Sequence, residues 1–350
     1  MKTRDGILIT GASGVLGQNM VNYLVTKGHT NLTLLDITKP KQGICDNFPF
    51  IKADITDSSL NPKILNGINI VIHCASAAPS YKAALIKAIV VKGTERLLAM
   101  AHSKNVDRFI YISSTAVYGI PNQVPVYETS ELQDYHDPYN QAKIAAENVC
   151  QKYRNQGMCI PILRPRTFLG PGRLGTFAML NDWAMEGRNF PLLGSGSNRY
   201  QFLDVEDLCQ AIYLCIEHPH QIVNDTFNIG AKEFKSIKED YQAVLDAAGF
   251  GKKIVMLPAA PALFILRFME RFKLMPLYKR LYEKIVIDYY VSTDKAESVL
   301  GYSPKYSNSD TLVRCYHWYI ENLNSFKNSS GSANSVPWKQ GIIRLLKPLF

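Results

Sequence analysis

The stretch Gly6-Ile7-Leu8-Ile9-Thr10-Gly11-Ala12-Ser13-Gly14-Val15-Leu16-Gly17, near the amino terminus, decides the fold. Its first five residues predict a short buried strand, its glycines predict a tight turn, and a helical pattern follows to about Lys27. A strand, a glycine turn and a helix in this order place backbone N–H groups and a helix N-terminus against a pyrophosphate. A glycine-rich turn alone can also be a simple tight connection, so the next element supplies the check.

The second predicted strand, at residues 31–35, ends in Asp36, which follows Gly17 by 19 positions. An acidic residue about 20 positions after the turn accepts the hydroxyls of an adenosine ribose and repels a 2′-phosphate. Asp36 therefore favours NAD over NADP as the cofactor. The alternative is an aspartate that only ends a strand and begins a turn.

Further strands alternate with helical segments along the first part of the chain. They are predicted at residues 50–55, 68–73 and 108–112. Alternating strands and helices are typical of an α/β fold with a doubly wound parallel sheet, the Rossmann arrangement. His73 ends the fourth strand with no partner motif beside it, so we expect this histidine to be structural.

A cluster of hydroxyl side chains, Ser113-Ser114-Thr115, follows the fifth strand. Hydroxyls in a loop are usually turn formers, but catalytic groups of open α/β sheets also lie beyond the carboxyl ends of strands. About 25 residues later, Pro138 predicts the first turn of a helix. Tyr139 and Lys143 share one face of that helix because they are four positions apart. A nearby ammonium favours the phenolate form of a tyrosine, so Tyr139 is a candidate proton shuttle for an alcohol.

The formal charge of +9 is concentrated in the carboxyl-terminal part of the 350-residue chain. Residues 251–290 and 325–350 together hold the whole surplus of basic over acidic side chains. A nucleic-acid-binding protein would carry basic residues and stacking aromatics on its main body, and this sequence does not, so we predict no nucleic-acid partner. The surplus instead indicates contact with an anionic surface, such as a peripheral contact with a membrane.

The seven cysteines are scattered and contain no Cys-x-x-Cys pair, which is typical of buried free thiols in a reducing compartment. No metal site is predicted. The sequence shows no secretory signal and no run of about 18 apolar residues that could span a bilayer. We therefore expect a cytoplasmic protein, with a peripheral position at the membrane as the alternative.

These motifs together resemble the extended short-chain dehydrogenase/reductase superfamily, and within it the NAD-dependent epimerase/dehydratase family. The resemblance extends over residues 5–323 and includes Gly11/Gly14/Gly17, Asp36, Ala53-Asp54, His73-Cys74-Ala75-Ser76, Ser113-Ser114, Val117-Tyr118-Gly119, Tyr139/Lys143, Leu163-Arg164-Pro165, Gly170-Pro171-Gly172, residues 202–208 and residues 227–230. It implies a Rossmann domain with a smaller, mostly helical carboxyl-terminal substrate domain. As a set, the motifs are specific for the superfamily and not for one substrate.

The resemblance also implies roles for individual residues. Tyr139 would exchange a proton with a substrate hydroxyl or carbonyl, Lys143 would bind the nicotinamide ribose and stabilise the phenolate, and Ser114 would hydrogen-bond the reacting oxygen. A hydride would pass between a substrate carbon and the nicotinamide, coupled to proton transfer through Tyr139. The predicted NAD-binding residues are Gly11, Ser13, Gly14, Val15, Leu16, Gly17, Asp36, Asp54, Ile55, Cys74, Ala75, Ser76, Tyr139, Lys143 and Pro165. The predicted substrate-binding residues are Ser114, Thr115, Tyr139, Thr167, Arg173 and Arg199.

Several positions depart from the pattern of the nucleotide-sugar enzymes in this family. Thr167 stands where an asparagine is common, Arg199 is displaced by one position from the usual arginine, and the segment 75–90 is short. The first interpretation is nevertheless a nucleotide-sugar 4-epimerase. A 4,6-dehydratase is disfavoured, because the hydroxyl loop reads Ser-Thr-Ala at residues 114–116 in place of Thr-Asp-Glu.

Two other interpretations stay open. A dehydrogenase of the 3β-hydroxysteroid or dihydroflavonol type would act on a lipid-like alcohol, and the short 75–90 segment and the aromatic, basic carboxyl-terminal region favour it. A noncatalytic NAD-binding scaffold is disfavoured because Ser114, Tyr139 and Lys143 are all present.

The chain is predicted to divide into an NAD-binding domain at residues 1–165, to which residues 200–230 return, and a substrate domain at residues 166–199 and 231–323. Aromatic and basic residues recur at helical spacing between residues 264 and 289, as in an amphipathic helix pair over the active site or a surface for a membrane or apolar substrate. Residues 324–336 predict a flexible linker. Residues 337–350 predict a basic amphipathic tail that would anchor at an interface or dock on protein. We also expect a homodimer.

Overall fold

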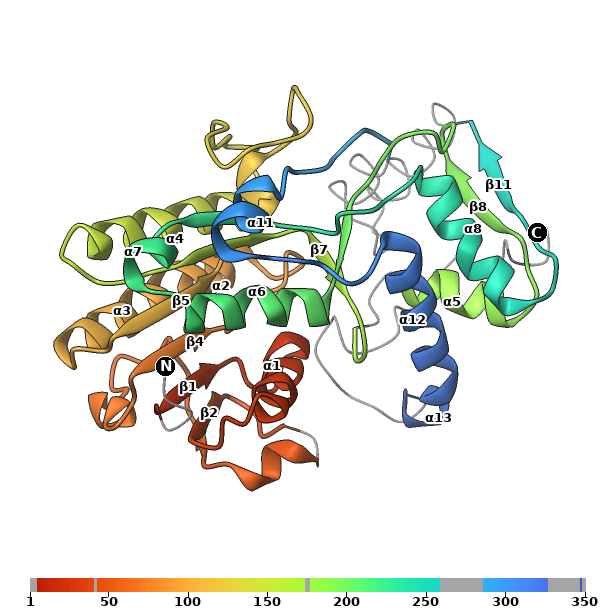
Figure 1. Ribbon diagram of the computed structural model, residues 1–350. Coiled ribbons are helices and arrows are strands. Elements are labelled where there is room, and N and C mark those ends of the chain that lie inside the picture. Colours follow the sequence, from red (N-terminus) through yellow and green to blue (C-terminus); the bar gives the residue numbers. More distant parts are fainter. Residues whose placement is uncertain (1–4, 41–42, 174–176, 259–285, 327–346, 348–350) are drawn as a thin grey trace.

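A parallel sheet of seven strands forms the centre of the computed structural model, which describes residues 5–40, 43–173, 177–258, 286–326 and 347 (Figure 1). Its strand order is β10-β6-β5-β4-β1-β2-β3, and every neighbouring pair is parallel. The strands are β1 (Ile7–Thr10), β2 (Leu32–Asp36), β3 (Phe50–Lys52), β4 (Ile70–His73), β5 (Arg108–Ile112), β6 (Ile162–Pro165) and β10 (Thr226–Ile229). The chain order reverses between β1 and β4, which confirms the predicted doubly wound Rossmann fold.

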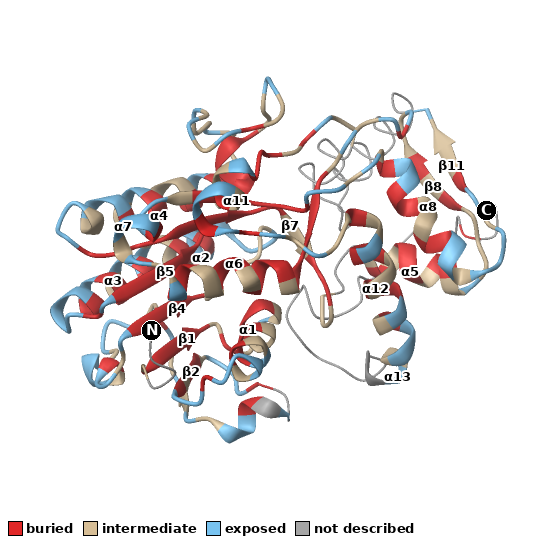
Figure 2. Cartoon of the chain, in the orientation of Figure 1, coloured by how far each residue is buried: buried red, intermediate tan, exposed pale blue. Residues whose placement is uncertain are grey.

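Helices cover both faces of this sheet because successive residues of each strand point to opposite faces. In β1, Ile7 and Ile9 pack toward α1 (Val15–Thr26), α6 (Val205–Glu217) and α11 (Asp294–Leu300). Leu8 packs on the other face, with α3 (Thr94–Ser103) and α4 (Pro138–Arg154). Figure 2 shows the strands as buried between these helices. Burial on both faces explains why the strands are nearly unbroken apolar runs in the sequence.

Short helical turns fill several connections. They are η1 (Ile44–Asn47), η2 (Pro62–Leu65), η4 (Thr115–Tyr118), α7 (His220–Val223) and α13 (Leu323–Phe326). Helix α2 (Ala83–Ile86) and the π-helical segment η3 (Lys87–Gly93) continue without a break into α3, so residues 83–103 form one helix. Three strands are shorter than predicted, since β1 begins at Ile7, β3 ends at Lys52 and β4 begins at Ile70. The reason is pairing: β3 has ladder partners on β2 only as far as Asp36, where β2 itself ends.

A second hydrophobic core lies to the right of the sheet in Figure 1. It is formed by α5 (Phe177–Met185), α8 (Ile237–Ala248), α12 (Asn308–Glu321) and the parallel pair β8 (Phe190–Leu193) and β11 (Ile254–Leu257). Trp183 is fully buried in it, edge to face with Phe190 at 5.5 Å between ring centres. A further parallel pair, β7 (Thr167–Leu169) and β9 (Phe202–Asp204), continues from β6 toward this core.

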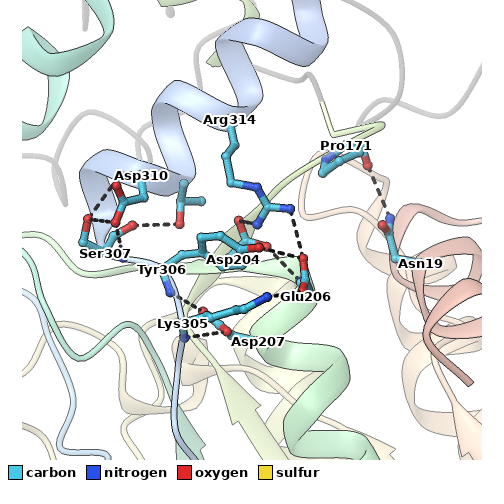
Figure 3. A network of polar contacts seen from close by, with 11 residues as sticks. Asn19, Pro171, Asp204, Glu206, Asp207, Lys305, Tyr306, Ser307, Asp310 and Arg314 are labelled. Atoms are coloured by element: carbon cyan, nitrogen blue, oxygen red, sulfur yellow. Dashed lines mark hydrogen bonds and ion pairs between the residues drawn. The ribbon is translucent and has the colours of Figure 1, made fainter. Parts of the chain in front are cut away.

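Polar contacts join the start of α6 to α12 (Figure 3). Asp204 caps α6 by accepting the N–H of Glu206 at 2.9 Å, and it also accepts a hydrogen bond from Arg314 of α12 at 2.8 Å. Arg314 donates in addition to Glu206 at 3.1 Å. Burial raises the pKa of Asp204 to about 6, although the cap and the guanidinium favour its carboxylate form. The motif at residues 202–208 thus attaches the second core to the main sheet.

The predicted helix pair at residues 264–289 lies outside the described residues except for its last four positions. The linker is described only at its start, and the tail only at Lys347, which is buried and donates to Asp182 and to Glu186, the latter at 2.9 Å. Among the described helices, none is long and apolar enough to cross a membrane. All seven cysteines are free and six are buried, in agreement with the sequence prediction.

Candidate active site

The glycine turn lies where the strand order reverses, between the carboxyl ends of β1 and β4. Gly11 has a φ of +68°, and a Cβ added there would lie 2.6 Å from the backbone nitrogen of Ala75. A Cβ added at Gly17 would lie 2.3 Å from the carbonyl oxygen of Gly11. Gly14 caps α1 without a side-chain hydrogen bond, so the turn presents the positive end of a helix. A backbone this closely packed, with no side chain at Gly11, Gly14 and Gly17, fits the pyrophosphate of a dinucleotide.

Asp36 lies against the same turn. One carboxylate oxygen accepts the N–H of Ser13 at 2.9 Å, and the other accepts the N–H of Ile37 at 2.7 Å. A carboxylate has about four acceptor positions, so these bonds orient Asp36 and leave capacity for ribose hydroxyls. Asp54 is exposed and Ile55 is buried, and both follow β3 at the same edge of the sheet. Their position fits the predicted adenine contact.

Cys74, Ala75 and Ser76 continue from β4 directly beside the glycine turn. The N–H of Cys74 donates to the carbonyl of Thr10 at 3.1 Å, which extends the pairing of β4 with β1. Burial raises the pKa of the Cys74 thiol to about 12, while the charge of Lys143 opposes that shift. The thiol therefore stays protonated, and it offers a neutral surface to a cofactor.

The close approach at Gly11 gives a direct prediction. Gly11→Ala should lower the affinity for NAD by at least about tenfold, because an added Cβ would push the turn away from residues 74–75. Gly301→Ala is the matched control, because Gly301 has a φ of +67° and no atom within 4 Å of an added Cβ. The measurement is an NAD titration beside a thermal unfolding curve. Equal NAD affinities in the two variants would contradict the prediction.

Helix α4 begins as the sequence predicted, with Pro138 in its first turn. Asp137 caps it by accepting the N–H of Tyr139 at 3.0 Å. The side chain of Lys143 is buried, and its Nζ donates to the carbonyl of Ile112 at 2.8 Å, at the end of β5. The same Nζ lies 5.8 Å from the centre of the Tyr139 ring. The structure therefore brings the phenol and the ammonium together at the carboxyl end of a central strand.

The hydroxyl loop packs against this helix. Ser114 caps η4, and its Oγ accepts the N–H of Ala116 at 3.1 Å, so its own O–H can still donate. Asn140, which is 1% exposed, donates to the carbonyl of Ala116 at 2.7 Å. Bonds from Lys143 and Asn140 thus reach the chain on either side of Ser114. Asn140 was not among the predicted site residues, although its place beside Tyr139 was a usable signal.

A buried ion pair supports the same arrangement. Glu147, one turn after Lys143 on α4, pairs with Arg164 of β6 at 2.6 Å and accepts a hydrogen bond from the Ser113 hydroxyl. Arg164 also donates to the hydroxyl of Tyr118 at 2.7 Å. Ser113, Tyr118 and Arg164 were identified as motif positions, but the network was not predicted. The signal for Glu147 was its spacing of four positions from Lys143.

His73 is engaged on both ring nitrogens. Nδ1 lies 2.7 Å from the hydroxyl of Thr10, and Nε2 lies 3.0 Å from the hydroxyl of Thr94. Burial, and next the charge of Lys143, lower the pKa of His73 to about 3, so the ring is neutral. This agrees with the structural role expected for it.

Two of the predicted substrate residues are threonines near the end of β6. The hydroxyl of Thr115 donates to the carbonyl of Pro165 at 3.4 Å, a long hydrogen bond that joins the hydroxyl loop to β6. The hydroxyl of Thr167 lies 3.5 Å from that of Tyr200. Thr115 is therefore grouped with Ser114, and Thr167 begins the pair of strands that leads toward the second core.

The two predicted substrate arginines stack on aromatic rings. The guanidinium of Arg173 lies 4.3 Å from the centre of the Phe168 ring, and that of Arg199 lies 4.7 Å from the Phe234 ring. Within the described residues, no hydrogen bond or ion pair joins Arg199 to the hydroxyl loop.

Comparison with known proteins places these features in a wider context. The model of the NAD dependent epimerase/dehydratase family matches residues 7–230. The chain is 34% identical over 345 residues to the uncharacterised protein y4nG of Sinorhizobium fredii, covering 97% of this chain and 85% of that protein. It is 27% identical over 350 residues to a 3 beta-hydroxysteroid dehydrogenase/Delta 5-->4-isomerase of Mycobacterium tuberculosis, covering 93% of each.

Other relatives act on nucleotide sugars according to their names. The chain is 26% identical over 361 residues to a UDP-glucose 4-epimerase of Halalkalibacterium halodurans, covering 93% of this chain and 98% of that one. The crystal structure of a UDP-glucuronic acid 4-epimerase of Bacillus cereus in complex with NAD superimposes with a TM-score of 0.74 at 24% identity, covering 91% and 99%. This structural likeness confirms the fold.

Proposed function

Because the chain belongs to the NAD dependent epimerase/dehydratase family, we propose that it uses NAD to oxidise and re-reduce a secondary alcohol of a nucleotide sugar, as a 4-epimerase does. The observation that supports the proposal is the buried Lys143, whose Nζ lies 5.8 Å from the centre of the Tyr139 ring and donates to the carbonyl of Ile112, two residues before Ser114. The nearly full-length likeness to a UDP-glucose 4-epimerase supports the choice of substrate class.

The proposed cofactor site follows the carboxyl edge of the sheet. The turn from Gly11 to Gly17 would hold the pyrophosphate, Asp36 the adenosine ribose, and Asp54 with Ile55 the adenine. Residues 74–76 would line the middle of the cofactor, and Pro165 would also contact the cofactor. When bound, NAD supplies the acceptor for a hydride from the substrate carbon.

The three catalytic candidates would share the proton chemistry. Tyr139 would take the proton of the substrate hydroxyl as the C–H bond breaks, and would return it when the new C–H bond forms. The ammonium of Lys143 is held by a carbonyl and lies close to the ring, so it would stabilise the phenolate without leaving the site. Ser114 would donate to the reacting oxygen in both directions. No net oxidation of the substrate results.

The substrate and its recognition are part of the proposal. Thr115 and Thr167 would contact the sugar, and Arg173 and Arg199 would bind the diphosphate. We also propose the division into an NAD-binding domain (1–165 and 200–230) and a substrate domain (166–199 and 231–323), although α11 of the last range packs in the core of the main sheet. A cytoplasmic homodimer with a peripheral membrane contact through the carboxyl-terminal region completes this proposal.

A dehydrogenase acting on a lipid-like alcohol is the second candidate. Its support is the 27% identity to a 3 beta-hydroxysteroid dehydrogenase over almost the whole of both chains. The short 75–90 segment is compatible with it. Such an enzyme would produce NADH in proportion to its product, whereas an epimerase would not.

Mass spectrometry of released ligands tests the proposal. The purified chain is saturated with NAD, desalted and denatured, and the small molecules in the supernatant are identified. We expect NAD together with a uridine or thymidine diphosphate sugar. Release of NAD with a sterol would overturn the nucleotide-sugar assignment in favour of the second candidate.

A further inference from the structure

Arg166, between β6 and β7, is a buried arginine that neither the motifs nor the proposed chemistry assigns. Its Nε donates to the carbonyl of Gln201 at 3.0 Å, and its Nη2 donates to the carbonyl of Tyr289 at 2.8 Å. Its Nη1 lies 3.4 Å from the hydroxyl of Thr115. The guanidinium also lies 4.0 Å from the centre of the Tyr289 ring and 4.7 Å from that of Tyr200.

The partners of Arg166 differ in kind from those of Arg164, two positions earlier. Arg164 is neutralised by Glu147, whereas in the described part of the chain no carboxylate forms an ion pair with Arg166. Neutral acceptors and two ring faces must therefore offset the cost of burying its charge. A lysine at this position could not bond all three oxygen acceptors together, because only a branched guanidinium has N–H groups that point toward each of them.

Tyr289 connects Arg166 to the hydroxyl loop. Its own hydroxyl donates to the carbonyl of Thr115 at 2.7 Å, next to Ser114 in the chain. One residue further along, Asn140 of α4 donates to the carbonyl of Ala116. The chain just after Ser114 is thus held both by the helix that bears Tyr139 and by a segment 174 positions away from Thr115 in the sequence.

We propose that Arg166 and Tyr289 form a bracket that sets the position of Ser114 and Thr115 relative to helix α4. Both are positioning residues, since they act through the backbone of the hydroxyl loop. The inference rests on the proposed function, because it takes Ser114 as the group that bonds the reacting oxygen. Misplacement of a catalytic group by about 1 Å can cost about 100-fold in rate. Loss of a single hydrogen bond of the bracket should cost about tenfold in kcat.

The first test compares two buried tyrosines. Tyr289→Phe removes the hydroxyl that reaches Thr115 and keeps the ring that stacks on Arg166. Tyr302→Phe is the control, because Tyr302 is equally buried and donates its hydroxyl to the carbonyl of Gly230 at 3.1 Å. With UDP-glucose as the probe, Tyr289→Phe should lower kcat about tenfold at unchanged NAD affinity, and Tyr302→Phe should not.

The second test replaces the arginine. Arg166→Lys keeps the charge but not the fork, and it should reproduce the loss seen in Tyr289→Phe. The double variant should lose no more kcat than either single variant, because both changes disrupt the same bracket. Arg154→Lys is the control, since Arg154 also donates to backbone carbonyls, those of Ile160 and Asp225, at the far end of α4.

Hydrogen exchange gives a readout that does not depend on turnover. In Tyr289→Phe, the backbone amides of residues 113–118 should exchange faster than in the wild type, and in Tyr302→Phe they should not. Equal exchange in the two variants, or equal kcat, overturns the bracket. A wild-type protein that converts no nucleotide sugar contradicts the proposed function, and the exchange of residues 113–118 then still decides whether the bracket exists.

Discussion

Tyr139→Phe is expected to lower turnover by about 10³-fold while leaving the affinity for NAD unchanged. In the proposed mechanism the phenol accepts and returns the substrate proton, and a general acid–base contributes about 10²–10⁴-fold to a rate. The ring itself is partly buried against the core beneath α4, so phenylalanine keeps the packing of the helix. Steady-state kinetics and an NAD titration measure the two effects separately.

Tyr153→Phe is the matched control for this variant. Tyr153 lies on the same helix and packs against the same core, but it lies near the far end of α4. Loss of the Tyr153 hydroxyl should leave kcat within about twofold of the wild type, because changes away from a site are usually close to neutral. Wild-type turnover in Tyr139→Phe would contradict the proposed role of Tyr139 as the proton shuttle.

Arg164→Met is expected to reduce the free energy of unfolding by about 3–5 kcal/mol. The variant leaves the carboxylate of Glu147 buried without its cation, and it also removes a donor to the Tyr118 hydroxyl. Burying an unpaired charge costs far more than the pair contributes by itself. Urea unfolding followed by circular dichroism measures the change.

The control for Arg164→Met is an exposed ion pair. Lys232 lies 2.8 Å from Glu297 at the surface, and Lys232→Met should reduce the free energy of unfolding far less than Arg164→Met does. The double variant Arg164→Met with Glu147→Gln should be more stable than the sum of the single losses predicts. An Arg164→Met protein as stable as the Lys232→Met protein would show that the buried pair does not hold β6 to α4.

The local features of the fold could be predicted from the sequence because they depend on residues close together in the chain. Gly11, Gly14 and Gly17 define a turn that leaves no room for side chains, and Asp36 follows at the spacing that brings it to that turn. Pro138 and the spacing of Tyr139 from Lys143 predicted the start and the face of α4. The structure confirms each of these elements.

The support of the candidate site could not be predicted in the same way. Arg166 makes its contacts with residues 201 and 289, which no local pattern connects to it. Glu147 and Arg164 pair across two elements, and neither residue alone indicates a partner. Strand ends were also misplaced, because the length of a strand depends on its neighbour, as β3 depends on β2. These features depend on contacts between segments that are far apart in the chain, and a single sequence does not reveal which segments meet.

Turnover in D₂O tests the central claim most directly. The wild-type chain is incubated with NAD and, separately, with UDP-glucose, UDP-glucuronic acid, dTDP-glucose and a 3β-hydroxysteroid. Epimers have equal masses, so the products are separated by chromatography and identified by NMR, while mass spectrometry detects deuterium and absorbance detects NADH. We expect one nucleotide sugar to be converted to its epimer without net NADH and without deuterium at the inverted carbon, because the same hydride leaves and returns. Accumulation of NADH with the hydroxysteroid, while every nucleotide sugar stays unchanged, would contradict it.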